Sequence, residues 1–282
     1  MKRLLLATDL SARSDRALER ALALAHEHDA ELAVIHVIDD DLVASVAHAR
    51  EEEALKVIQG HIDKLKEDNA PRVSVEVAPG RAYAEILEKA EQTNTDLIIL
   101  GMHREQALKD MFRGTTVERI VRAGNVPVLL VKDRITGPYR RIMVAVDFSV
   151  YSRRAVTFAT EFGPEAEFHL VHAYDVPFKG FIRGQDTQRE VSKRHQLQLQ
   201  KMIDEEMASF LADQGTEPPK LQPVMQEGSP YEVILQQADR LKPDLLVLGT
   251  HGRTGAAHSI LGSVAETLLT DPPCDVLAVK AW

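Results

Sequence analysis

Glycines and side-chain donors gather in one short stretch, GTHGRTGAAHSILGSV (residues 249–264), directly after an apolar run. Gly249 and Gly252 have no Cβ, so their backbone can adopt positive φ and approach a ligand closely. Threonine, histidine and arginine side chains around these glycines add hydrogen-bond donors. This composition at the end of a predicted strand favours a loop that surrounds an anion such as phosphate.

The end of the same stretch has the residues of a helix start. Nine residues separate Gly252 from Gly262 and Ser263, and we expect Ser263 to be the N-cap of a helix over 264–269. The N–H groups at a helix start favour an anion, and a serine hydroxyl adds another donor. Loop and helix start together predict a phosphate site. Asp147, at the end of another predicted strand, could accept hydrogen bonds from ribose hydroxyls.

Other interpretations of these residues stay open. Glycine-rich loops between a strand and a helix are often only tight turns, and neither GxxxxGK[ST] nor GxGxxG occurs. His36 and His172 lie in strand runs, which favours a place in the core or the wall of a site over a ligand role. His258 has no partner at metal-ligand spacing, so we predict no metal site. Cys274, beside two prolines, is expected to have a packing role.

The elements that position these residues occur twice in the sequence. KRLLLATDLS (2–11) matches RRIMVAVDFS (140–149) at a shift of 147 − 9 = 138 residues. GRAYAEILEKAEQTNTDLIILGMH from Gly80 matches GSPYEVILQQADRLKPDLLVLGTH from Gly228 at a shift of 228 − 80 = 148 residues. We therefore expect two copies of one domain, joined by a linker around Gly137 and Pro138. The predicted domains are copy one, residues 1–135, and copy two, residues 139–282.

Short apolar runs alternate with helical periodicity in each copy, which predicts an α/β fold. We expect two repeated domains, each a five-stranded parallel sheet with helices on both faces, similar to a Rossmann fold. Ligands of such sheets bind beyond the carboxyl ends of the strands, where the strand order reverses. The expected strands of copy two are 141–146, 167–173, 221–226, 244–249 and 275–280.

Composition narrows the class of protein. The chain has 282 residues, a formal net charge of −9 and a pI near 5.7, which argues against a nucleic-acid-binding surface. One cysteine excludes an internal disulfide and fits a reducing compartment. The apolar run before Asp9 is too short for a signal-peptide core, and no run approaches the roughly 20 residues of a membrane helix. We therefore expect a cytoplasmic protein without a membrane span.

These motifs resemble the universal stress protein family in a tandem two-domain form. That family has a nucleotide signature of G-x-x-G, nine residues, then G-[S/T], and copy two reads Gly249-x-x-Gly252, nine residues, Gly262-Ser263. The VDFS after the first strand of copy two and the VHA at the end of its second strand are also similar. The resemblance covers nearly the whole chain and implies an ATP site, with or without Mg²⁺, across the switch point of copy two.

Carried over position by position, the resemblance implies a set of ATP-binding residues in copy two. Ala145 and Asp147 would contact adenine and ribose, and the backbone of Ala173 would contact the base. The residues implied at the phosphates are Gly249, Thr250, His251, Gly252, Arg253, Thr254, Gly255, Gly262, Ser263, Val264 and Ala265.

Copy one departs from that signature. Arg104 replaces the second glycine and adds a long side chain where the backbone should meet phosphate. Glu105 places a negative charge where copy two has Arg253. Asp9 and the Gly114-Thr115 helix start are retained. We expect copy one to have a weakened or lost nucleotide site, although Arg104 could bind a different anion.

Two classes of function follow. In the first, the chain is an ATP-binding universal stress protein that regulates a stress response, with the nucleotide in copy two and a protein partner that the sequence does not identify. In the second, it is a non-enzymatic binding module for another phosphorylated or apolar small molecule, with little or no ATP affinity. No carboxylate pair or nucleophile–base set is evident around the loop, so any ATP hydrolysis is expected to be slow.

The last strand of each copy, 126–131 and 275–280, is short and apolar, and the resemblance implies that it is a sheet edge. An apolar edge favours pairing with another edge. The short linker keeps the two edges at high effective concentration. We therefore expect the copies to form an intramolecular pseudo-dimer through these strands, and a homodimer of whole chains stays open.

Overall fold

The computed structural model describes residues 1–41, 43–65, 71–102, 116–174, 201–202, 204–210, 212, 221–251 and 261–280. Copy one contains β1 (Arg3–Thr8), α1 (Ala12–Glu27), β2 (Glu31–Ile38), α2 (Ala44–Leu65), β3 (Val73–Pro79), α3 (Ala82–Gln92), β4 (Leu97–Gly101), α4 (Thr116–Ala123) and β5 (Val128–Val131). Copy two contains β6 (Arg141–Ala145), α5 (Val150–Phe162), β7 (Glu167–Tyr174), β8 (Leu221–Glu227), α7 (Pro230–Leu241), β9 (Leu245–Gly249), α8 (Ser263–Thr270) and β10 (Asp275–Val279).

All ten strands form one sheet, in the order β3-β2-β1-β4-β5-β10-β9-β6-β7-β8. Strands within each copy pair in parallel, which confirms the predicted five-stranded parallel sheet of each domain. The five strands predicted for copy two are all present, with ends that differ by one residue. The central strands are apolar throughout because both faces are covered: Leu97–Leu100 and Leu245–Leu248 are fully buried.

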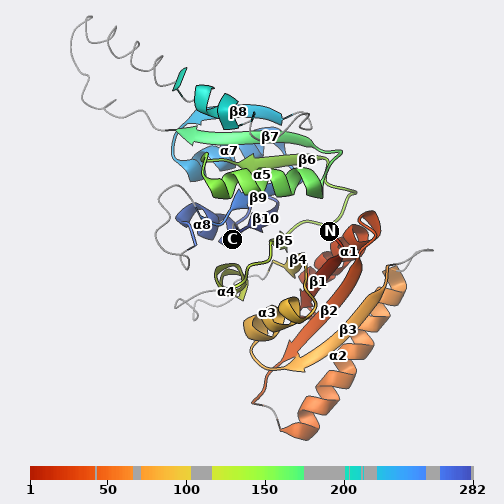
Figure 1. Cartoon of the computed structure of the whole chain (residues 1–282). Coiled ribbons are helices and arrows are strands. Elements are labelled where there is room, and N and C mark those ends of the chain that lie inside the picture. Colours follow the sequence, from red (N-terminus) through yellow and green to blue (C-terminus); the bar gives the residue numbers. More distant parts are fainter. Residues whose placement is uncertain are drawn as a thin grey trace, which may run out of the picture.

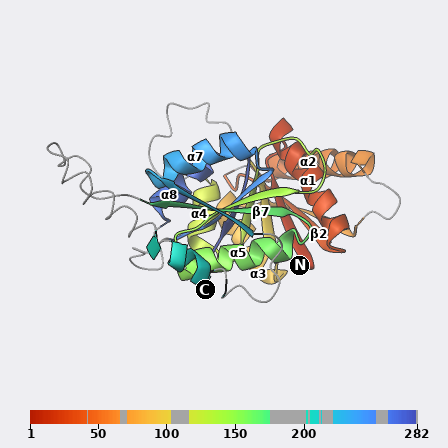
Figure 2. The same ribbon diagram turned by 90° about the horizontal axis from the view of Figure 1, so that it is seen from above.

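Helices cover both faces of the sheet. One core contains side chains from α1, α2 and α5, and the other contains side chains from α3, α4, α7 and α8. Figure 2 shows α5 and α7 on opposite sides of β7. The apolar residues of α1 recur at helical spacing, so they form one stripe that is buried in the core. This stripe includes Ala17, Leu18, Ala21, Leu22 and Ala25.

The strand order reverses once in each copy, beside its first strand. In copy two, β6 lies between β7 and β9, and in copy one β1 lies between β2 and β4. In open α/β sheets the connections leave toward opposite faces at such a point, and ligands bind in the crevice beyond the carboxyl ends of the strands, here those of β6 and β9. This is the place where the motif residues of copy two were expected. No helix in the described parts of the chain is both long and apolar enough to cross a membrane.

β5 and β10 join the two copies by antiparallel pairing, which confirms the expected pseudo-dimer contact (Figure 1). Leu277 lies opposite Leu129, with Val276 opposite Leu130 and Ala278 opposite Val128. Because 277 − 148 = 129, Leu277 and Leu129 are counterparts in the repeat. The pairing is therefore symmetric about these two leucines, as it would be in a dimer with a two-fold axis.

Two lysines repeat this symmetry. The Lys132 ammonium donates to the carbonyl of Pro272 at 2.6 Å, and the Lys280 ammonium donates to the carbonyl of Gly124 at 2.9 Å. Pro272 and Gly124 are also counterparts, since 272 − 148 = 124. In each copy, the lysine that follows the last strand thus donates to the other copy. The carbonyl that accepts lies in the turn before the last strand of that other copy.

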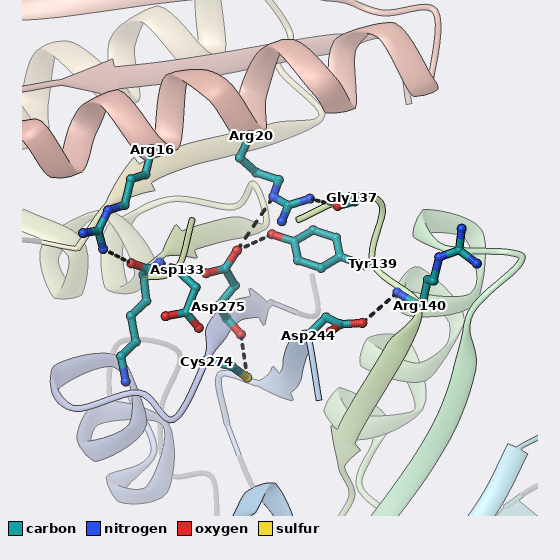
Figure 3. Close-up of polar contacts among 10 residues, drawn as sticks. Arg16, Arg20, Asp133, Gly137, Tyr139, Arg140, Asp244, Cys274 and Asp275 are labelled. Carbon is teal, nitrogen blue, oxygen red and sulfur yellow. Dashed lines mark hydrogen bonds and ion pairs between the residues drawn. The ribbon is translucent and has the colours of Figure 1, made fainter. Parts of the chain in front are cut away.

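Asp275 breaks the symmetry, because its counterpart at position 275 − 148 = 127 is a proline. Asp275 is almost fully buried, and its side chain points toward Tyr139 and Arg20 (Figure 3). One oxygen accepts the N–H groups of Lys132 and Asp133, at 2.8 and 3.0 Å, and the other accepts the Tyr139 hydroxyl at 2.6 Å. Burial raises the pKa of Asp275, and these hydrogen bonds oppose the rise. The Asp275 carboxylate of copy two thus accepts three donors from residues 132–139.

Arg20 of α1 completes this junction from copy one. Its guanidinium lies 4.1 Å from the centre of the Tyr139 ring, and it donates to the carbonyl of Gly137 at 2.8 Å. The Arg20 Nε is 3.9 Å from the Asp275 carboxylate, which makes a buried ion pair. Burial, and next the Asp275 carboxylate, raise the pKa of Tyr139 well above its ordinary value, so the phenol keeps the proton that it donates.

We expect Tyr139→Phe to lower the free energy of unfolding by about 1–3 kcal/mol, because the buried Asp275 carboxylate loses a donor and gains no water. Urea unfolding of the full chain measures this change. Tyr83→Phe is the matched control, since the partly buried Tyr83 ring packs within copy one, and we expect a change below about 0.5 kcal/mol. Equal effects of the two variants would show that the Tyr139 hydroxyl is not needed by Asp275.

Cys274 has the packing environment that the sequence predicted. The residue is buried directly before β10, and its Sγ donates to the carbonyl of Asp275 at 3.4 Å. Burial raises the pKa of Cys274 to about 12.

Because the thiolate is the reactive form, we expect iodoacetamide at pH 8 to leave Cys274 unmodified in the native protein. The same thiol should react readily in urea, and mass spectrometry distinguishes the two states. Alkylation of the native chain at the unfolded rate would contradict this expectation.

Candidate functional site

The predicted site residues of copy two that the structure describes lie at the carboxyl ends of three strands and at the start of α8. Ala145 ends β6 and lies opposite Val171 of β7 and Leu248 of β9. Ala173 lies near the end of β7, and both alanines are partly buried. They therefore form part of the wall of the crevice at the switch point.

Asp147 lies in the turn between β6 and α5. One of its carboxylate oxygens accepts the Ser149 N–H at 3.0 Å and the Ser149 hydroxyl at 2.5 Å. Phe148 between them has a left-handed φ of 63°, which lets the chain reverse within three residues. Ser149 is the N-cap of α5 and accepts the Ser152 N–H at 3.3 Å. The turn thus fixes the aspartate at the mouth of the crevice.

Copy one has the same turn. The Ser11 N–H donates to the Asp9 carboxylate at 3.0 Å, and Leu10 has a left-handed φ of 58°. Ser11 caps α1 as Ser149 caps α5. The Asp9 carboxylate also accepts the Ser14 hydroxyl at 2.5 Å. This half of the site is therefore retained in copy one, in agreement with the sequence.

His172 and His36 occupy equivalent places in the walls of the two copies. The Nδ1 of His172 lies 2.8 Å from the carbonyl of Val146, and that of His36 lies 2.8 Å from the carbonyl of Thr8. Since a carbonyl only accepts, each ring carries its proton on Nδ1. Each ring ties its own strand to the end of the neighbouring strand, as a wall residue would.

Gly249 packs directly against the first turn of α5. A Cβ at this position would lie 3.1 Å from the backbone carbon and from the Cβ of Tyr151. Gly249 is also absent from the glycines with positive φ among the described residues, which are Gly80, Gly137 and Gly228. The missing Cβ therefore lets the end of β9 pack against the first turn of α5, and Gly249 does so without the positive φ that glycine permits.

Thr250 connects the end of β9 to the start of α8. Its side chain is buried, and its N–H donates to the carbonyl of Val279 at 3.0 Å. Its own carbonyl accepts the N–H of Gly262 at 2.9 Å. The Thr250 hydroxyl lies 2.9 Å from Nδ1 of His251. Two parts of the motif that are twelve residues apart in sequence are thus held together by one residue.

The N-cap of α8 is Gly262, and the expected N-cap, Ser263, is the first residue of the helix. The backbone explains this difference. Gly262 is extended (φ −62°, ψ 142°), its N–H is used by Thr250, and its carbonyl already accepts the N–H of Glu266 at 2.9 Å. The next three N–H groups have no acceptor within a helix, and they belong to Ser263, Val264 and Ala265.

Those three N–H groups are of the kind that can bind an anion. They lie at the positive end of the helix dipole, next to the end of β9. Glu266 adds a negative charge in the first turn of α8, and Arg122 of copy one lies 3.3 Å from that carboxylate. Copy one therefore contributes a cation beside the helix start of copy two.

The middle of each loop lies outside the described residues. In copy two these residues include Gly252, Arg253, Thr254, Gly255 and His258, and in copy one they include Arg104, Glu105, Gly114 and Thr115. The predicted contacts of these residues with phosphate therefore stay predictions.

Tyr151 is a residue of this site that the sequence reasoning missed. Its ring packs on the His251 imidazole with 4.9 Å between ring centres and 31° between ring planes. The motif gives no signal for this contact, because Tyr151 comes from the first turn of α5 and lies outside the glycine-rich stretch. Its counterpart in copy one, at 151 − 138 = 13, is Arg13.

Comparison with known proteins gives the same organisation. A sequence profile of the universal stress protein family matches residues 1–132 and again residues 138–280. The chain is 26% identical to a universal stress protein E homolog of Haemophilus influenzae, over 99% of this chain and 97% of that protein. It is 28% identical to universal stress protein E of Photorhabdus laumondii, over 71% of this chain and 66% of that protein, just under two thirds of its length.

A solved structure shares the whole fold. The universal stress protein of Archaeoglobus fulgidus superposes with a TM-score of 0.67 and 22% identity, over 99% of this chain and 98% of that chain. Two consecutive matches to one family profile, over nearly the whole length, leave one assignment. The chain belongs to the universal stress protein family and carries its domain twice.

Proposed function

We propose that copy two binds ATP, with or without Mg²⁺, and that the loaded chain acts as a cytoplasmic regulator of a stress response through a protein partner. One observation carries this proposal. The three N–H groups at the start of α8 stand next to the end of β9, because the Gly262 N–H donates to the Thr250 carbonyl. A row of N–H groups at a helix start is suited to a phosphate chain.

The hydrogen-bond donors at this place are suited to the triphosphate of ATP. Ser263, Val264 and Ala265 would hold phosphate oxygens through their N–H groups, and His251 lies at the edge of the same place. A carboxylate has about four lone-pair sites. Asp147 could therefore accept ribose hydroxyls while one of its oxygens holds Ser149. When bound, Mg²⁺ would neutralise part of the triphosphate charge.

Binding is the proposed activity, and hydrolysis is expected to be slow. The Asp147 carboxylate is engaged in the turn that caps α5, so it is placed as an acceptor of hydrogen bonds. A slowly hydrolysed nucleotide keeps the protein in one state long enough for a partner to bind. Mass spectrometry of the ligand released from freshly purified protein tests this directly. Another phosphorylated or apolar molecule in place of ATP would favour the binding-module alternative.

We expect Gly262→Asp to weaken ATP binding at least about tenfold. Aspartate is a favourable N-cap, so its carboxylate would take the N–H groups at the start of α8 and repel the phosphates. The helix itself should be as stable as before. Isothermal titration calorimetry measures the affinity, and thermal unfolding checks the fold.

Gly114→Asp is the matched control, since Gly114 is the counterpart of Gly262 in copy one, and ATP affinity should be unchanged. Equal losses from both substitutions, or two equivalent ATP sites in the unmodified chain, would contradict the assignment of the nucleotide to copy two.

Asp147→Asn tests whether Asp147 contacts the ribose or serves only the turn before α5. The amide oxygen can still accept the Ser149 N–H, but an NH₂ group replaces the second acceptor. We expect ATP binding to weaken by about 1–3 kcal/mol, as for loss of a hydrogen bond to a charged group. Affinity for inorganic tripolyphosphate should stay the same, and Asp9→Asn in copy one should change neither. Equal weakening for both ligands would show that Asp147 serves only the turn.

A further inference from the structure

The first turn of α5 contacts the start of the phosphate loop in two separate ways. The backbone of Tyr151 packs where Gly249 has no side chain, with 3.1 Å to the position of a Cβ. The ring of Tyr151 packs on His251, two residues later, with 4.9 Å between ring centres. The backbone contact brings the loop to the helix, and the ring contact concerns a single side chain of the loop.

Copy one has the same backbone packing as copy two but lacks the Tyr151 ring. A Cβ at Gly101, the counterpart of Gly249, would lie 3.1 Å from the backbone of Arg13 and of Ser14. The backbone packing is thus the same in both copies. At the ring position, copy one has the flexible cation of Arg13, while copy two has an aromatic ring. The ring pair therefore belongs to the copy with the intact glycine signature.

His251 is held from both sides in copy two. Its Nδ1 lies 2.9 Å from the hydroxyl of the buried Thr250, and its ring lies against Tyr151. Thr250 is itself fixed by β10 and by the start of α8. A histidine with its ring plane and one nitrogen both restrained has little rotamer freedom to lose when a ligand binds.

We propose that Tyr151 is a positioning residue of the copy-two site. Its ring restrains His251 at the edge of the phosphate-binding helix start, so that the imidazole is oriented before the nucleotide arrives. Tyr151 acts through His251 and makes no contact with the ligand itself. This inference rests on the proposed ATP binding.

Tyr151→Ala tests the role of the ring, because alanine keeps the Cβ and the backbone atoms that pack on Gly249. We expect ATP affinity, measured by calorimetry on the full chain, to fall about three- to tenfold, the range of one aromatic contact. Tyr151→Phe keeps the ring and should bind ATP within about twofold of the unmodified chain. Arg13→Ala, the matched change in copy one, should leave ATP affinity unchanged.

The coupling to His251 is the readout that a merely structural role would not produce. Once His251→Ala has removed the imidazole, adding Tyr151→Ala should cause no further loss of ATP affinity. In the nucleotide-free protein, the NMR signal of the His251 ring should carry a ring-current shift that Tyr151→Phe keeps and Tyr151→Ala removes.

The experiments distinguish failure of the positioning role from failure of the proposed ATP binding. Additive losses in the double variant, or unchanged affinity of Tyr151→Ala, would overturn the positioning role while ATP binding by the unmodified chain stands. Absence of ATP binding by the unmodified chain would overturn the proposed function, and the positioning role toward ATP with it.

Discussion

The antiparallel pairing of β5 with β10 is the contact on which the rest of the molecule depends. Each of these strands would be an exposed apolar edge in an isolated copy, with its N–H and C=O groups facing solvent. Paired, they become the centre of a ten-stranded sheet, and all of their side chains are buried. The pairing also fixes Thr250, because β10 supplies the carbonyl that accepts its N–H. The candidate site of copy two is thus attached to the strand that joins the copies.

Some regions are nearly the same in the two copies, and others differ between them. The sheet centre, the two lysines after the last strands and the aspartate turns are nearly the same in both copies. The differences lie at the linker, where Asp275 replaces a proline, and at the phosphate loop, where Tyr151 replaces an arginine. The shared parts hold the fold, and the changed parts lie where a linker or a ligand has to be held.

The sequence was sufficient for features that depend on local pattern. Apolar runs such as Leu245–Leu248 predict buried strands, because a strand covered on both faces has no polar side to display. The alternation of strands and helices then predicts the switch point. The pairing of β5 with β10 follows from the apolar last strands together with the family resemblance, which implies that they are sheet edges. The same reasoning placed Asp147 and the α8 start at one edge of the sheet.

Features that depend on a distant partner were beyond the sequence. The N-cap of α8 is Gly262 because its N–H donates to Thr250, a residue of another element. Gly249 is a glycine because the backbone of α5 passes there, and nothing in the glycine motif indicates that neighbour. The carboxylate of Asp275 likewise finds its donors only after the linker has folded over β10. Each of these roles is defined by a contact between elements, so a linear pattern cannot contain it.

Asp275 has no carboxylate counterpart in copy one, and this limits how one copy could replace the other. In the repeat, the counterpart of Arg20 is Phe158, since 20 + 138 = 158. Two second halves joined through β10 would therefore bury each aspartate beside a phenylalanine, without the Arg20 guanidinium that lies beside it now. A buried carboxylate without such partners is strongly disfavoured. The two halves are therefore not interchangeable at this junction, because the Asp275 carboxylate of copy two is paired with Arg20 of copy one and a second copy two offers no equivalent cation there.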